Sequence, residues 1–188
     1  MRKFALVAVF LLLCGTFAMA QKAELGAGWN YLHFDNGGVP GVDSSFPAGF
    51  FVDGTYYFAK IIGLAGDFEY NKHTFPAGEL GDVSVDASAL SFHAGPRVKV
   101  RMGKIEPFAH ALFGFTRASG SGGGTSISDT VFSTKLGGGV DVGVAPHFAV
   151  RLGEFNYYMT RFNSASAFSF GGQDHQNNFT FSAGIVIR

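Results

Sequence analysis

The sequence predicts an all-β protein, an eight-stranded antiparallel up-and-down transmembrane β-barrel that follows a cleaved signal peptide. Three observations lead to this prediction. Segments of roughly 9 to 13 residues, rich in Phe, Val, Thr and Tyr, alternate between apolar and small or polar side chains. Glycine occurs 27 times in 188 residues and interrupts every stretch long enough for a helix. The connectors between the segments alternate between long and short.

Residues 1–20 have the pattern of a signal peptide, which leaves residues 21–188 as the barrel domain. Met1-Arg2-Lys3 is basic, an apolar run follows it, and Ala18-Met19-Ala20 fits a cleavage site. A transmembrane anchor needs about 20 apolar residues, and this run is shorter. We therefore expect cleavage after Ala20 and export from the cytoplasm.

Cleavage would also remove Cys14, Arg2 and Lys3. Cys14 is the only cysteine, so the mature chain would form no internal disulfide. A lipid anchor on Cys14 is less favoured than cleavage because Leu13 is larger than the residue that normally precedes such a cysteine. The remaining 12 of the 14 Lys and Arg face 14 Asp and Glu, which is not the basic balance of a nucleic-acid-binding protein.

Eight segments have strand character, and their connectors fall into two kinds. The segments are 22–33, 48–58, 62–72, 86–100, 105–117, 131–144, 148–160 and 177–188. The long connectors are 34–47, 73–85, 161–176 and SerGlySerGlyGlyGlyThrSer at 119–126, and the short ones are 59–61, 102–104 and 145–147. Four long loops at one end and three short turns at the other are typical of a barrel with four extracellular loops. We expect the 119–126 segment to be a flexible surface loop.

The two parities within each segment differ in polarity. Leu90, Phe92, Ala94 and Val98 alternate with Ser91, His93, Gly95 and Arg97, and the other segments behave similarly. Mid-strand charges thus share a parity with Gly, Ser and Asn, which predicts a polar interior and an apolar outer wall. A soluble periplasmic barrel with an apolar ligand inside would need the opposite parity. Because eight strands leave room only for side chains, we expect a plugged interior.

The interior charges are expected to form a network of ion pairs. Its predicted members are Asp67, Glu69, Arg97, Lys99, Glu106, Lys135, Asp141, Arg151 and Glu154. Unpaired buried charges would cost several kcal/mol each, so we expect the network to hold the barrel shut, and Arg97→Met to lower the unfolding temperature. Hairpin registers estimated from the short turns bring Arg97 near Glu106, and Asp141 near Arg151.

Two further interior features follow from the same registers. Arg151 and Glu154 differ in parity, and a bulge at Gly153 would turn both inward. His93 and His110 are expected to form an interior pair. Such a pair can bind a metal or sense pH, but with no cysteine and no carboxylate at ligand spacing we interpret it as polar filling. We expect no metal and no cofactor.

Aromatic residues gather near the ends of the predicted strands, as in the two girdles of membrane barrels. Those expected near the outer ends are Trp29, Tyr31, Tyr70 and Tyr157, and those near the inner ends are Tyr56, Phe58, Phe108 and Phe148.

The signal peptide, the eight segments, GlyGlyGlyValAspValGlyValAlaProHisPheAlaValArg at 137–151 and PheThrPheSerAlaGlyIleValIleArg at 179–188 together resemble the OmpA/OmpX-type outer-membrane β-barrel family. The resemblance covers essentially all of residues 21–188. It implies a monomer in the cell outer membrane of a double-membraned bacterium, in contact with outer-membrane lipid and inserted by the barrel assembly machinery. That machinery reads the closing strand in this family, usually at a terminal aromatic residue, where this chain has Ile187-Arg188.

The expected function is a structural or surface-interaction role without enzymatic activity, and the sequence does not assign the extracellular partner. A narrow porin-like channel for small solutes or ions is the alternative. A lipid-modifying enzyme ranks lower: Ser91-Phe92-His93 is the nearest match, but it lies mid-strand at interior parity and lacks the His-x-Ser order of the lipid A deacylase barrels.

Overall fold

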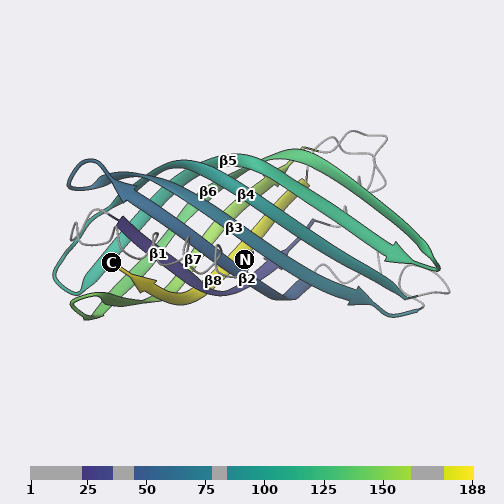
Figure 1. The fold of residues 1–188 in the computed structure, drawn as a ribbon, viewed down its shortest axis with the longest axis horizontal. Helices are drawn as coiled ribbons and strands as arrows, with labels where there is room; N and C mark the ends of the chain where they lie inside the picture. The colour runs from purple at the N-terminus through teal and green to yellow at the C-terminus, as the bar shows by residue number, and fades with distance from the viewer. Residues whose placement is uncertain (1–22, 36–44, 78–83, 162–175) are drawn as a thin grey trace, which may run out of the picture.

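The computed structural model describes residues 23–35, 45–77, 84–161 and 176–188, which form a closed barrel of eight antiparallel strands (Figure 1). The strands are β1 Ala23–His33, β2 Ser45–Tyr57, β3 Ile62–Phe75, β4 Val85–Lys99, β5 Ile105–Gly122, β6 Thr125–Ala145, β7 Phe148–Thr160 and β8 Gln176–Ile187. Each strand pairs with its neighbours in sequence order, and β8 closes the ring against β1. The predicted fold class is confirmed, and the expected signal peptide lies outside the described residues.

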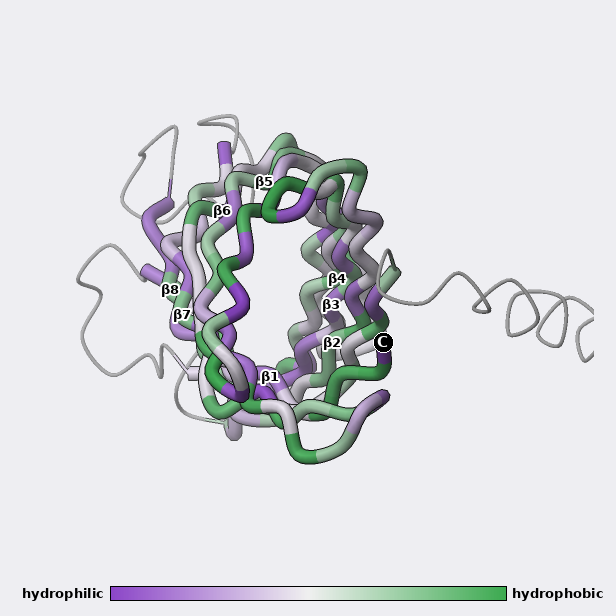
Figure 2. The backbone as a smooth tube through the Cα atoms, turned by 90° about the vertical axis from the view of Figure 1, so that its left-hand side faces the viewer, coloured by the Kyte–Doolittle hydropathy of each residue, from purple (hydrophilic) through white to green (hydrophobic). Residues whose placement is uncertain are grey.

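Hydrophilic and hydrophobic residues alternate along the strands (Figure 2), and buried and exposed residues alternate with the same period in β4. Along β4, Ser91, His93 and Arg97 are at most 2% exposed, whereas Leu90 and Phe92 are exposed on the outer wall. The apolar residues therefore face outward, as the parity predicted. In the described part of the chain, no helix has the length and apolar character needed to cross a membrane.

Phenylalanines form a continuous row on the outer wall. Phe68, Phe92, Phe115 and Phe132 lie directly opposite one another in the pairings of β3 to β6. On β5 the outward apolar positions run from Ile105 to Phe115, about 34 Å along the strand and about 25 Å tall at a tilt near 40°. This height equals that of the apolar band of outer-membrane barrels. The strands continue beyond this band.

The connection between β5 and β6 differs from the prediction of a long flexible loop. The two strands extend to Gly122 and from Thr125, and only Gly123 and Gly124 join them, with φ of 57° and 80°. A two-residue hairpin of type I′ needs positive φ at both central residues, and Gly-Gly adopts this without steric cost. The prediction was wrong because alternating Gly and Ser continue the strands. The hairpin projects at the right of Figure 1, opposite the chain's C-terminal end.

The predicted pairing of Arg97 with Glu106 would centre the β4–β5 turn between residues 101 and 102. In the structure the centre lies about two residues further along the chain. Met102 bridges to Ile105, so Gly103 and Lys104 form the turn, and Gly103 has a φ of 68°. Every pairing between β4 and β5 follows from this position. Arg97 therefore lies opposite His110.

The predicted irregularity in β7 is present. The pairing with β8 shifts between Arg151 and Glu154, and the pairing with β6 shifts at the same place. Both side chains are buried, at 1% and 3% exposure. A bulge at Leu152 and Gly153 thus reverses the parity and keeps both charges inside.

Candidate functional site: the barrel interior

The interior of the barrel contains more acids than bases. Among the described residues, the buried acids are Glu24, Asp53, Asp67, Glu69, Glu106, Asp141 and Glu154, and the buried bases are Arg97, Lys99, Lys135 and Arg151. All nine predicted members of the charge network are in this group. Arg101 and Arg188 add positive charge at the end of the short turns, where they contact Glu24 and Glu106.

Lys99 joins three acids in the half of the barrel nearest the short turns. Its Nζ lies 2.6 Å from Glu24 Oε2, 2.8 Å from Asp141 Oδ2 and 3.6 Å from Glu106 Oε2. These acids come from β1, β6 and β5, so one ammonium group on β4 connects distant parts of the wall. The predicted contact between Arg97 and Glu106 is absent, because the turn at Gly103 and Lys104 places Arg97 opposite His110. Glu106 is instead contacted by Arg188 and lies near Lys99.

Arg151 on β7 is a second buried base that contacts three acids. Its Nε lies 2.9 Å from Asp141 Oδ1, and its Nη1 lies 3.0 Å from Asp53 Oδ1 and 2.7 Å from Glu154 Oε2. Arg97 on β4 contacts the other oxygen of Asp53. The guanidinium of Arg151 therefore has three buried carboxylates within ion-pair distance, which offsets the cost of burying the charges.

Asp53 is the main interior residue that the sequence analysis missed. It shares the inward parity of β2 with Phe51 and Tyr57, which are also buried. Aromatic residues on the inward parity conceal the polar pattern that identified the other charges. Asp67 could have indicated that Asp53 faces inward, because the two residues lie directly opposite each other in the β2–β3 pairing.

Phe108 lies inside the barrel and not in the inner girdle where the sequence placed it. It is 6% exposed and shares its parity with Glu106 and His110. The guanidinium carbons of Arg97 and Arg151 lie 4.9 and 4.6 Å from its ring centre. The ring therefore supports two cations through cation–π contacts in the middle of the charge network.

A second charged group lies nearer the long-loop end. Lys135 Nζ is 2.7 Å from both Asp67 Oδ1 and Glu69 Oε1. His93 contacts Asp67 Oδ1 through Nδ1 at 3.4 Å and Ser133 Oγ through Nε2 at 2.8 Å. Carboxylate, imidazole and hydroxyl thus follow one another in the order found in hydrolase triads, although Lys135 also holds the carboxylate.

His93 and His110 do not form the predicted pair. His93 lies opposite Gly114, whereas His110 lies opposite Arg97 and contacts Asn156 through Nε2 at 2.7 Å. The position of the turn at Gly103 and Lys104 separates them by four residues along the pairing. Among the described residues, no group of three or more His, Cys, Asp or Glu is arranged to hold a metal ion.

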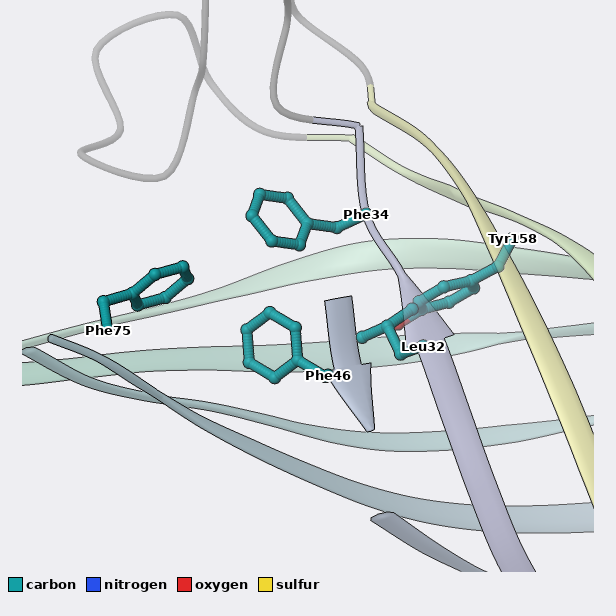
Figure 3. Packing of buried hydrophobic residues seen from close by; sticks show 5 residues of the cluster. All are labelled: Leu32, Phe34, Phe46, Phe75 and Tyr158. Carbon is teal, nitrogen blue, oxygen red and sulfur yellow. The ribbon is translucent and has the colours of Figure 1, made fainter. Parts of the chain in front are cut away.

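Apolar residues cover the interior at the long-loop end. Leu32, Phe34, Phe46, Phe75 and Tyr158 form a buried cluster, which we call the mouth cluster (Figure 3). The Phe46 ring centre lies 5.4 Å from that of Phe34 and 6.2 Å from that of Phe75, both edge to face. Tyr158 connects this cluster to the polar interior, because its hydroxyl forms a hydrogen bond with the Ser91 hydroxyl at 2.9 Å. The alternating pattern predicted a polar interior throughout, and this apolar cluster departs from it.

The comparisons with known proteins agree with this architecture. The sequence profile of the family described as outer membrane protein beta-barrel domain matches residues 5–186. The chain belongs to this family. It is therefore an outer-membrane barrel protein, and no curated protein sequence matches it.

Solved outer-membrane barrels share the fold. Ail, the attachment invasion locus protein of Yersinia pestis, is 18% identical over 89% of this chain and 99% of its own, with a TM-score of 0.56. Neisserial surface protein A is 16% identical over 88% of this chain and 96% of its own, with a TM-score of 0.65. Ail has also been solved with the heparin analogue sucrose octasulfate, and that structure is 20% identical with a TM-score of 0.57.

The predicted girdle residues lie on the outer wall of this outer-membrane barrel protein. Trp29, Tyr56, Phe58, Phe148 and Tyr157 are exposed, and Tyr31 and Tyr70 are half-buried. Trp29 Nε1 donates to the Pro47 carbonyl oxygen at 2.8 Å. An indole with an apolar ring and a satisfied N–H is suited to a membrane interface. In the outer membrane, the short turns face the periplasm and the mouth cluster faces the exterior.

Proposed function

We propose that this protein is a monomeric structural and surface-interacting component of the outer membrane with a plugged interior. The observation that carries the proposal is the set of ion pairs that cross the barrel. Asp53 on β2 contacts Arg97 on β4 and Arg151 on β7, so that one carboxylate connects widely separated strands. Opening a path for solutes would require these pairs to break inside a poorly hydrated space, at several kcal/mol each.

The mouth cluster supports the same proposal from the extracellular end. Phe34, Phe46 and Phe75 are at most 8% exposed and pack against one another. An apolar constriction opposes the passage of water and ions because it does not replace their hydration. Two successive barriers, one apolar and one charged, favour a plugged barrel over the narrow porin-like channel.

Conductance in planar bilayers tests the plug. We expect no current steps from the wild type, and none from Phe46→Ala, because the charged barrier remains. The double variant Asp53→Ala/Arg151→Ala should produce steps. The matched control Asp86→Ala/Arg117→Ala removes the same charges from the outer wall and should stay closed. Steady steps from the wild type would contradict the plug and favour the channel.

We propose no enzymatic activity, although Asp67, His93 and Ser133 follow the order of a triad. All three are at most 3% exposed, and Lys135 lies 2.7 Å from the carboxylate that would have to support the histidine. A lipid carbonyl would need access to Ser133 through the wall or the mouth cluster. Mass spectrometry of lipid A from cells with and without the protein should give the same acyl pattern. Loss of an acyl chain that depends on Ser133 would contradict this.

The extracellular ends of the strands are the parts that we propose to meet partners, since the β5–β6 hairpin extends beyond the apolar band. We further propose insertion by the barrel assembly machinery. Proteoliposomes that contain this machinery should convert the denatured chain to the heat-modifiable folded form faster than empty liposomes. Sedimentation in detergent should give the mass of one chain, and a dimer would contradict the proposed monomer.

A further inference from the structure

A polar groove lies on the outer wall of β3 to β6, directly beyond the row of phenylalanines. Its volume is about 380 Å³. Tyr70, Lys72, Asp86 and Arg117 line it together with five serines. The groove is on the lipid-facing side of the strands and not in the interior. Its occupant must therefore approach along the outer surface of the barrel.

The pairings of the strands show how abruptly the wall changes from apolar to polar. The row beyond Phe68, Phe92, Phe115 and Phe132 consists of Tyr70, Leu90, Arg117 and Thr130. The next row consists of Lys72, Ser88, Ser119 and Ser128. The row of four aromatic rings and the row of one ammonium group and three hydroxyls are thus only four residues apart along each strand. A ligand lying along this wall would meet apolar contacts at one end and polar contacts at the other.

The groove has a net positive charge. Arg117 Nη2 donates to Ser128 Oγ at 3.1 Å, and within the described ranges no carboxylate lies at ion-pair distance from Arg117. Lys72 Nζ is 3.6 Å from Asp86 Oδ2. The Thr74 hydroxyl donates to Asp86, and this bond and the Lys72 ammonium hold the pKa of the carboxyl below its usual value. One cation is thus partly neutralised, and the other is available to an anion.

The five serines supply hydroxyls that can donate to anionic oxygens and also accept from sugar hydroxyls. Ser121 and Ser126 lie opposite each other in the row beyond Ser119 and Ser128. Arg117 and Lys72 supply the charge, and the Phe115 side chain, which is 60% exposed, continues the wall toward the lipid chains. This combination fits a phosphorylated sugar that carries acyl chains.

We propose that the groove binds the phosphorylated sugar headgroup of an outer-leaflet glycolipid, with Arg117 and Lys72 on its phosphate and the acyl chains along the row of phenylalanines. The outer-membrane location puts such lipids beside this wall. The proposal is independent of the plugged interior, since the groove is on the opposite face of the strands. It adds a headgroup site to the general contact between the barrel and lipid.

Native mass spectrometry of the detergent-solubilised barrel with bisphosphorylated lipid A tests the proposal. We expect Lys72→Gln/Arg117→Gln to weaken lipid A binding about tenfold, because charged hydrogen bonds to the phosphate are lost. The matched control is Lys60→Gln/Lys104→Gln, which removes two exposed lysines from the periplasmic turns and should bind as the wild type does. Folding of each variant is checked by heat-modifiable migration in gels.

Two further probes separate the parts of the ligand. Lipid A with both phosphates removed should bind the wild type and Lys72→Gln/Arg117→Gln equally weakly. Glucosamine 1-phosphate, which lacks acyl chains, should not compete at the concentrations at which lipid A binds. Equal lipid A binding by the groove variant and the wild type, or effective competition by the free sugar phosphate, would overturn the assignment to a membrane glycolipid.

Discussion

Arg151 and Asp141 face each other directly across the β6–β7 pairing inside the barrel, with Nε 2.9 Å from Oδ1. The same guanidinium reaches Asp53 and Glu154. Arg151→Met would leave three buried carboxylates without this partner. We expect unfolding in urea to show a loss of about 3–5 kcal/mol. Arg117→Met, on the outer wall, is the matched control and should unfold as the wild type does. Equal midpoints for both variants would contradict a stabilising network.

Gly114 allows β4 and β5 to approach closely. A Cβ at this position would overlap the Phe92 carbonyl oxygen and crowd the His93 Cα at 2.7 Å, and both are backbone atoms. We expect Gly114→Ala to destabilise the barrel by about 1–3 kcal/mol, because the backbone must shift. Gly66→Ala is the control, since nothing lies within 4 Å of its added Cβ. Urea unfolding of the two variants compares them directly, and equal stability would show that the strands separate without cost.

The β5–β6 hairpin depends on Gly124, whose φ is 80°. Gly124→Val should cost about 1–2 kcal/mol locally, because a β-branched residue is strained in the left-handed region. The hairpin should then fray, and trypsin should cleave the folded barrel after Arg117 faster than in the wild type. Gly123→Asn should leave the cleavage rate unchanged, since Asn-Gly is a favoured type I′ pair. Equal rates in Gly124→Val and wild type would show that the turn does not hold the hairpin.

Asp86 should titrate below the usual aspartate pKa of about 3.9. The hydrogen bond from Thr74 is the first cause and the charge of Lys72 the second, so Thr74→Val should raise the pKa. Because the pKa is lowered in the folded state, any stabilisation from this group is present above the ordinary pKa and is lost as the pH falls. NMR titration of the side-chain carboxyl measures it, with Thr130→Val as a control on the same wall. An unchanged pKa in Thr74→Val would contradict the assigned cause.

The strand number, the orientation of each face and the β7 bulge were predictable because side chains alternate with a period of two. That pattern specifies which side a residue faces, but it does not specify which residue lies opposite. The turn at Gly103 and Lys104 illustrates the difference. A small error in its position left the predicted charged residues on the correct face and still paired Arg97 with the wrong acid.

The residues missed by the sequence analysis share one physical cause. Phe46, Phe75 and Phe108 are aromatic yet point inward, where a rule based on lipid contact expects small or polar side chains. Aromatic side chains can also lie inside a barrel, where Phe108 contacts two cations and where Phe46 and Phe75 cover the interior at the long-loop end. Asp53 was missed for the same reason, since its inward neighbours Phe51 and Tyr57 are aromatic.

The pairing of β1 with β8 has a consequence for how the molecule forms. The Ser182 hydroxyl donates to Asn30 Oδ1 at 2.8 Å, and 152 positions of the chain separate the two residues. Contacts so distant in sequence make folding slow, since the entropy of a long loop is lost before the pairing stabilises the product. Until then, β1 and the growing end of the sheet both expose unpaired backbone groups that are prone to aggregate. Closing the ring between β1 and β8 is therefore the step that removes both exposed edges and, with them, the tendency to aggregate.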